Sequence, residues 1–284
     1  VIKHITQEKK DRTKAKPDIS SYGKEHIAKL QVAGNIGNSL VYTCAINKLS
    51  SYAKADKLPF EAVTYKFLED FNASMLAEGI KVNSISQYLR SVRALFNKAI
   101  KDGTIEAKTY PFSNFRIKSE KTISRALTKP ELAKIVDLGL PVNSSIWHYR
   151  NIFLLSYCFI GINLADLLTL TRENIIDGRI IFRRKKTHKV YSIQIQEKAN
   201  ELLSFYTSTI PVTSKEYLLP FIKNKNNLVQ LKKDILQATK TCNKYLVSMA
   251  NQCKIDKPIT TYYASYSWAN IAKSLGYSKE LIAE

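Results

Sequence analysis

The sequence predicts a mainly α-helical protein of two domains with one small β-hairpin, and three observations support this prediction. Apolar residues recur at helical spacing in four segments between residues 20 and 109. A second series of helical segments begins at Leu127 and is interrupted by residues 178–195, where two alternating apolar runs flank a basic middle. The chain of 284 residues, 45% of them hydrophobic, is long enough to form two buried cores.

The first half of the chain is expected to contain a leader, a helical domain and a linker. Residues 1–19 are polar and rich in lysine, as is typical of a leader or the end of a linker. Residues 20–109 are expected to form the helical domain, with helices over residues 20–32, 38–53, 61–78 and 83–101. Gly34 and Gly37 are expected to separate the first two helices. Residues 110–126 are predicted to be an interdomain linker, because Pro111 breaks helix and the apolar residues show no period.

The fourth of these helices divides its side chains between two faces. One face is apolar and consists of Ile85, Leu89, Val92, Phe96 and Ile100. A separate polar face consists of Arg90, Arg93, Asn97 and Lys101. The first face is expected to pack in the core, which leaves the second free to bind phosphates. A solvated surface without a ligand is the alternative interpretation.

The second domain is expected to occupy residues 127–284. Thr128 and Glu131 have the spacing of a capping box, and Pro130 lies in the first turn, where its missing N–H costs nothing. The sequence therefore predicts that a helix starts here. Further helices are expected over residues 149–159, over residues 197–206 and from residue 228 onward, with a loop over residues 211–219.

Residues 178–195 are predicted to form a β-hairpin with a long basic tip. Side chains two apart share one face of a strand, so Phe182, Arg184 and Lys186 are expected to point one way while Arg183 and Lys185 point the other. Arg184 and Lys186 would then reach one phosphate together. The alternative is a solvated hairpin tip.

The charge of the chain indicates a polyanionic partner. The net charge is +20, and residues 1–126 and 127–284 each hold 22 Lys and Arg against 12 Asp and Glu, which is +10 per half. An even excess on two folded parts predicts a clamp around nucleic acid. A basic ribosome-associated or membrane-surface protein would share this charge, but no apolar run reaches the roughly 20 residues that cross a bilayer. The four cysteines have neither metal spacing nor disulfide density, so we expect no metal and a cytoplasmic location.

Three motifs resemble the tyrosine recombinases, which form the phage integrase family. They are Phe182-x-Arg184-x-Lys186-Thr187, the corner with Gly161, Asp166 and Leu167, and the frame of Thr260, Ser267, Ala269 and Gly276. The positions of Tyr42, Tyr88 and Phe96 are similar to those in integrases of Bacteroides-type mobile elements. The resemblance implies an N-terminal SAM-like core-binding domain followed by an α+β tyrosine-recombinase catalytic domain.

The resemblance also implies strand cleavage without a metal or other cofactor. In this family a tyrosine attacks the scissile phosphate, arginines stabilise its charge, and a lysine, here Lys186, protonates the leaving 5′ oxygen. The family's first arginine position holds Asn163, which is also a candidate helix N-cap, and Arg184 is the candidate substitute. Tyr262 stands at the histidine position and Ser265 at the second arginine position. The chain stops at Glu284, and we expect it to be truncated before the nucleophilic tyrosine.

We therefore expect a site-specific DNA recombinase, or integrase, that binds double-stranded attachment sites as a two-domain clamp and self-associates on DNA. In complete form it is expected to cut and rejoin strands through a 3′-phosphotyrosine intermediate, as a cytoplasmic, nucleoid-associated protein. The alternatives are a catalytically inactive DNA-binding relative or remnant and a basic ribosome-associated protein. The residues expected to bind DNA are Arg90, Arg93, Asn97, Lys101, Arg183, Lys185 and Lys189.

Overall fold

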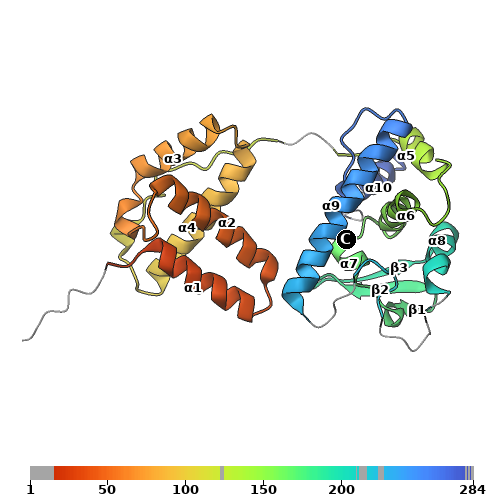
Figure 1. The fold of residues 1–284 in the computed structure, drawn as a ribbon, viewed down its shortest axis with the longest axis horizontal. Helices are drawn as coiled ribbons and strands as arrows, with labels where there is room; N and C mark the ends of the chain where they lie inside the picture. Colours follow the sequence, from red (N-terminus) through yellow and green to blue (C-terminus); the bar gives the residue numbers. More distant parts are fainter. Residues whose placement is uncertain are drawn as a thin grey trace, which may run out of the picture. The chain divides into compact units, whose positions relative to one another are not determined.

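The structure is a computed structural model, which describes residues 16–121, 125–208, 210, 216–222, 227–278, 280 and 282. It divides the chain into two compact units, Val1–Lys121 and Thr122–Glu284. In the parts that the structure describes, the first unit is helical and the second combines helices with a small sheet (Figure 1). The predicted leader lies outside these residues except for its last four positions.

The first unit contains four α-helices in its described part: α1 (Ile19–Val32), α2 (Ile36–Ala53), α3 (Tyr65–Ala77) and α4 (Val82–Lys101). Two predicted boundaries are wrong. Gly37 does not break a helix, because α2 already begins at Ile36 and the chain turns at Gly34, which has φ +71°. The third helix begins at Tyr65 and not at residue 61, because the Thr64 hydroxyl accepts the Phe67 N–H and caps the helix there. The preceding residues form the 3₁₀-helix η1 (Phe60–Ala62).

The core of the first unit gathers around α4. Leu89, Val92, Leu95 and Phe96 of this helix are almost fully buried. Phe96 makes edge contacts with Phe60 and with aromatic residues that follow the short helix η2 (Ala107–Thr109). The predicted apolar face of α4 is thus confirmed, although Ile100 is only half-buried.

The segment after η2 packs against this same core. Phe112 is buried, and Phe115 and Ile117 are partly buried against the cluster. The Asn83 amide pairs with both backbone groups of Glu120: its Nδ2 donates to the carbonyl at 2.9 Å and its Oδ1 accepts the N–H at 3.0 Å. The chain is therefore attached to the first unit as far as Glu120.

Six α-helices lie in the described part of the second unit. They are α5 (Lys129–Val136), α6 (Ser145–Cys158), α7 (Leu164–Leu167), α8 (Glu197–Thr207), α9 (Leu228–Gln252) and α10 (Tyr262–Ser274). Helix α7 is a single turn and is followed by the 3₁₀-helix η3 (Arg172–Asn174). The predicted capping box at the start of α5 is confirmed. The predicted loop over residues 211–219 falls largely outside the described residues.

The sheet of the second unit is antiparallel, with the order β1 (Ile175–Ile176), β2 (Arg179–Arg183) and β3 (Val190–Gln194). Asp177 and Gly178 connect β1 to β2 with positive φ at both residues, as a two-residue type I′ turn requires. The facing residues Ile180 and Ile193 are buried in the core. The predicted hairpin is confirmed, and its buried face fixes its register.

Two further properties concern membranes and metals. Within the described ranges, no helix is long and apolar enough to cross a membrane. The same part of the chain contains no group of three or more His, Cys, Asp or Glu that could hold a metal ion.

Candidate nucleic-acid interface

The loop at the tip of the β2–β3 hairpin corrects one prediction. Strand β2 ends at Arg183, so the alternation of side chains expected through Lys186 stops there. The Arg184 N–H donates to the Lys189 carbonyl at 2.9 Å, and the His188 N–H donates to the Arg184 carbonyl at 2.8 Å. His188 takes a positive φ of 58° to close this turn. Because residues 184–189 form a turn, Arg184 and Lys186 do not share a strand face, and this prediction is wrong.

Lys185 is turned back onto α7 and the residues that follow it. Its backbone N–H donates to Asp166 Oδ1 at 3.3 Å, and its ammonium donates to Thr169 Oγ1 at 2.8 Å. Burial lowers the pKa of Lys185, whereas the carboxylate of Asp166 raises it and Lys232 lowers it further. Lys185 thus holds the loop in place, and Lys186 beside it is exposed.

Two other cations of the hairpin contact the protein itself. Arg183 Nη1 donates to the His188 carbonyl at 2.9 Å. The ammonium of Lys189 lies 5.6 Å from the centre of the Tyr191 ring. These contacts order the loop, and both residues are exposed at its surface.

A pocket of about 380 Å³ lies beside this loop and collects residues from three distant segments. Asn163 comes from the start of α7, Arg184 from the hairpin loop and Ser265 from α10. Lys186 and Tyr262 do not line the pocket, and Tyr262 is 56% exposed at the start of α10. Of the five residues expected in the catalytic site, three line this pocket, whereas Lys186 and Tyr262 lie outside it.

Asn163 acts as the N-cap of α7, as the simpler interpretation predicted. Its Oδ1 accepts the Ala165 N–H at 2.9 Å. The residue is exposed, and its amide nitrogen is still a donor.

One wall of the pocket is set by contact between backbone segments. Gly161 has φ +72°, and a Cβ placed on it would lie 2.7 Å from Ser265 Cβ and 3.0 Å from Ser265 Oγ. Only glycine allows this approach. At the start of α10, the Thr261 N–H donates to Asn243 Oδ1 of α9 at 2.9 Å. Helix α10 is thus held by α9 and by the corner that precedes α7.

The polar face of α4 has the predicted exposure. Arg90, Arg93, Asn97 and Lys101 are all exposed, whereas the apolar face of the helix is in the core. This arrangement gives the first unit a stripe of three cations and one amide.

Helix α9 has a basic face that was not predicted from the sequence. Lys233, Lys240 and Lys244 are exposed and lie within about 40° of one another around the helix. Lys232, at the same end of α9 as Lys233, is close enough to Lys185 to lower its pKa. Lys233, Lys240 and Lys244 are seven and four residues apart, and this spacing places side chains on one face of a helix. The sequence could therefore have indicated this face.

Comparison with known proteins agrees with this geometry. Residues 18–117 match the family model of the phage integrase SAM-like domain. No curated protein sequence matches the chain.

Solved structures are similar over nearly the whole chain. A lambda integrase dimer bound to a COC′ core site has 17% identity and a TM-score of 0.62, with 94% of this chain and 93% of that chain covered. A lambda integrase tetramer bound to a Holliday junction has 16% identity and a TM-score of 0.63, with 94% and 76% covered. The Tn1549 transposon integrase in complex with transposon right end DNA has 12% identity and a TM-score of 0.63, with 94% and 90% covered. The chain therefore has the predicted fold, a SAM-like helical domain followed by an α+β domain that has the fold seen in these integrase structures.

Proposed function

We propose that this protein is a site-specific DNA recombinase of the tyrosine recombinase family, of the kind found in Bacteroides-type mobile elements. The observation that carries the proposal is the pocket shared by Asn163, Arg184 and Ser265. Asn163 and Ser265 stand where the family has arginines, and Arg184 supplies a guanidinium to the same pocket. Its substrate is duplex DNA at attachment sites, and its place of action is the nucleoid in the cytoplasm.

Both units contribute cations to DNA binding. The polar face of α4, the hairpin loop and the basic face of α9 present exposed lysines and arginines. Phosphate neutralisation with release of counterions supplies most of the affinity of such surfaces. Self-association on DNA is part of the proposal, since relatives of this fold were solved on DNA as a dimer and as a tetramer.

In the proposed reaction Arg184 binds the scissile phosphate and Lys186 is the general acid. The attacking tyrosine oxygen forms a bond to phosphorus as the bond to the 5′ oxygen breaks, and the lysine gives its proton to that oxygen. Tyr262 donates a hydrogen bond from the position where the family has histidine. Arg184 is a planar bidentate donor and can neutralise charge that the Asn163 amide cannot.

DNA binding is tested by its dependence on salt. A protein with six to ten phosphate contacts loses roughly 10³–10⁵ in affinity between about 50 and 200 mM salt. Arg90→Ala and Arg93→Ala are each expected to reduce the slope of log K against log salt by about one. Lys108→Ala is the matched control, because this exposed lysine pairs with Glu106 at 2.6 Å. Binding that does not respond to salt would contradict the proposal.

Catalysis is tested in a longer chain that includes the nucleophilic tyrosine. Lys186→Ala is expected to reduce strand cleavage on a nicked substrate by about two orders of magnitude or more while DNA affinity changes little. Arg184→Ala is expected to lose roughly 10²–10³ in rate, as for the loss of one charge-stabilising donor. Lys198→Ala on α8 removes the same charge from a surface pair with Glu201 and serves as control. Unchanged cleavage in both variants would remove the hairpin from the mechanism.

A second candidate is a catalytically inactive DNA-binding relative. It is favoured by the N-cap role of Asn163 and by Ser265, since neither side chain neutralises the charge of a phosphate. This candidate predicts salt-dependent binding to duplex DNA with no cleavage in the longer chain. The two variants of the preceding test then have no activity to lose, which separates the two functions.

A further inference from the structure

Helix α10 carries two residues of the proposed site, and the corner before α7 holds this helix on one side. Tyr262 is its first residue, and Ser265, less than one turn later, lines the pocket. A Cβ placed on Gly161 would lie 2.7 Å from Ser265 Cβ, so the corner and the helix are already in close contact. The corner therefore blocks movement of α10 toward it.

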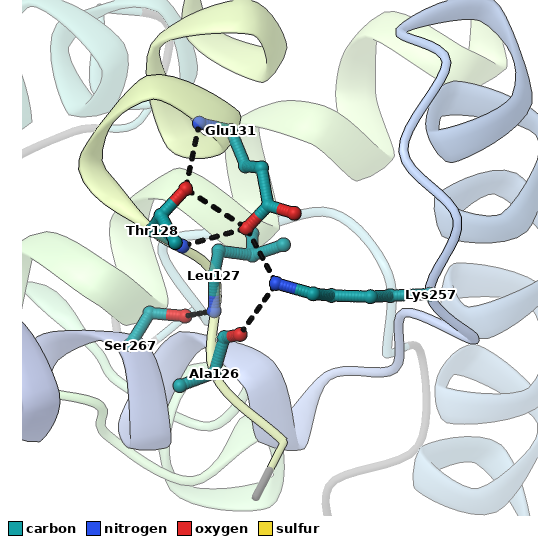
Figure 2. A network of polar contacts seen from close by, with 6 residues as sticks. All are labelled: Ala126, Leu127, Thr128, Glu131, Lys257 and Ser267. Atoms are coloured by element: carbon teal, nitrogen blue, oxygen red, sulfur yellow. Dashed lines mark hydrogen bonds and ion pairs between the residues drawn. The ribbon is translucent and has the colours of Figure 1, made fainter.

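The segment that precedes α5 holds α10 from the other side (Figure 2). The Leu127 N–H donates to Ser267 Oγ at 2.8 Å, and both residues are almost fully buried. Ser267 follows Ser265 by two positions, which is about 3 Å along the axis of the helix and about 200° around it. Leu127 therefore contacts α10 on the side opposite the pocket.

Lys257 joins the same segment to the loop that leads into α10. Its ammonium donates to the Ala126 carbonyl at 3.3 Å and to Glu131 Oε2 at 2.6 Å. Lys257 lies between α9 and α10, five residues before Tyr262. These contacts, which we call the clasp, involve Ala126, Leu127, Glu131, Lys257 and Ser267.

Glu131 makes the clasp a charged and specific contact. Its Oε2 also accepts the Thr128 N–H at 2.7 Å and the Thr128 hydroxyl at 3.0 Å. Burial raises the pKa of Glu131, but the bonds from Lys257 and Thr128 outweigh this and lower it overall. The carboxylate is thus ionised near neutral pH, and it joins the loop before α10 to the start of α5.

The clasp and the corner together leave α10 little freedom to move. A shift of α10 away from Leu127 by about 0.5 Å would stretch the bond to Ser267 beyond the usual limit of about 3.2 Å and leave a buried N–H without an acceptor. The same shift would press Ser265 against Gly161. In-line attack at phosphorus tolerates only about an ångström of misplacement, so contacts that fix α10 this closely bear on the proposed reaction.

We propose that the clasp positions α10 in the proposed site, with Ser267 and Lys257 as positioning residues that set the placement of Tyr262 and Ser265. This inference rests on the proposed function. Neither Ser267 nor Lys257 lines the pocket, so both act through the helix and not on the substrate.

The clasp is tested without DNA by hydrogen exchange of the Leu127 amide in the full chain. Ser267→Ala is expected to accelerate this exchange roughly tenfold, because the amide loses its acceptor and the segment opens more readily. Ser274→Ala is the control on the same helix, since that exposed hydroxyl bonds only locally to the Ile271 carbonyl. An exchange rate in Ser267→Ala equal to that of the natural chain would overturn the clasp.

The placement of α10 is tested by the fluorescence of Trp268, which directly follows Ser267, is half-buried and lines the pocket. The measurements use Trp147→Phe as background, because this change removes the other tryptophan of the chain. In this background, Ser267→Ala and Lys257→Met are each expected to shift the Trp268 emission to longer wavelength and to increase its quenching by acrylamide.

Two controls separate placement from stability and from charge. Gly178→Ala strains the β1–β2 turn at φ +70° and destabilises the same unit outside the clasp, so it should leave the Trp268 emission unchanged. Lys254→Met removes an exposed lysine three residues before Lys257 in the same loop, and it should also leave the emission unchanged. An unchanged emission in both clasp variants would overturn the positioning role.

The effect on the proposed reaction is measured in the longer chain that includes the nucleophilic tyrosine. Ser267→Ala is expected to reduce the cleavage rate at saturating DNA roughly ten- to a hundredfold, while the DNA concentration for half the maximal rate stays within about twofold. The reason is that the clasp acts on α10 and leaves the exposed cations in place. Ser274→Ala is expected to keep the natural values of both.

The outcomes separate this inference from the proposed function. If the natural longer chain does not cleave DNA, the proposed reaction fails, whereas amide exchange and Trp268 emission still decide whether the clasp positions α10. If Ser267→Ala accelerates exchange but leaves both the emission and the cleavage rate unchanged, the clasp is only structural and its positioning role is overturned. Faster exchange together with a shifted emission supports the proposal.

Discussion

Gly161→Ala is expected to destabilise the second unit and to displace α10. Two costs arise from the structure. At φ +72° an alanine has the left-handed backbone conformation, which costs about 1–2 kcal/mol. Its methyl group would lie 2.7 Å from Ser265 Cβ, so α10 or the corner must shift, and overpacking of this kind costs about 1–3 kcal/mol. The free energy of unfolding should therefore fall by about 2–5 kcal/mol.

Gly178→Ala is the matched control in the same unit. Gly178 has φ +70°, and the nearest atom to an added Cβ is Gln194 Nε2 at 3.6 Å, an ordinary contact. This variant carries the conformational cost without the clash. The difference between the two variants isolates the contact between Gly161 and Ser265.

Urea unfolding followed by tryptophan fluorescence measures both variants. Trp147 and Trp268 are the two tryptophans of the chain, and both belong to the second unit, so the signal reports on that unit. With a slope of about 2 kcal/mol per molar urea, the midpoint of Gly161→Ala should lie about 1–2.5 M below that of the natural chain, whereas Gly178→Ala should shift it by about 1 M or less. Equal midpoints for the two variants would refute the reasoning.

Three further predictions concern titration, thiol reactivity and covalent chemistry. Burial lowers the pKa of His148 below its usual 6.5, because the folded state disfavours the charged imidazole. The free energy of unfolding of the second unit should therefore be constant above about pH 6.5 and fall as the pH drops below that value. Urea titrations of His148→Gln should not show this loss. Burial raises the pKa of Cys242 to about 12, whereas Cys44 is exposed. Mass spectrometry after a short iodoacetamide treatment should therefore find Cys44 alkylated and Cys242 unmodified. Early labelling of Cys242 in the folded chain would contradict its burial. The chain of 284 residues should form no SDS-resistant adduct with a nicked suicide substrate. Three tyrosines, Tyr262, Tyr266 and Tyr277, are each at least half exposed. None of them is expected to attack the phosphate, because in-line attack tolerates only about an ångström of misplacement. An adduct that one of these three tyrosines is required to form would show that the site is misplaced.

Local patterns in the sequence predicted most of the elements. The helix periodicity identified α4 and its two faces, and the capping box located the start of α5. The hairpin followed from alternating apolar residues, two of which, Ile180 and Ile193, face each other in the core. These features depend on residues that are close in the sequence, so their signals are local.

Features that depend on distant partners could not be predicted in this way. The turn at the hairpin tip is held by Asp166 and Thr169, which lie 19 and 16 residues before Lys185. The hydrogen bond from the Leu127 N–H to Ser267 Oγ joins residues 140 positions apart, and serine alone does not indicate such a partner. The corner after α6 was expected from its glycine, but the close contact with Ser265 is visible only in three dimensions.

The contact between Gly161 and Ser265 also bears on which residues around the pocket can be substituted without unfolding the second unit. The backbone fixes the corner and α10 against each other, while the side chains of Asn163, Tyr262 and Ser265 are exposed and contribute little to the core. Substitutions at these three positions therefore leave the folding of the second unit largely intact. Gly161 has no such freedom, and it should vary far less among related chains than the residues of the pocket that it shapes.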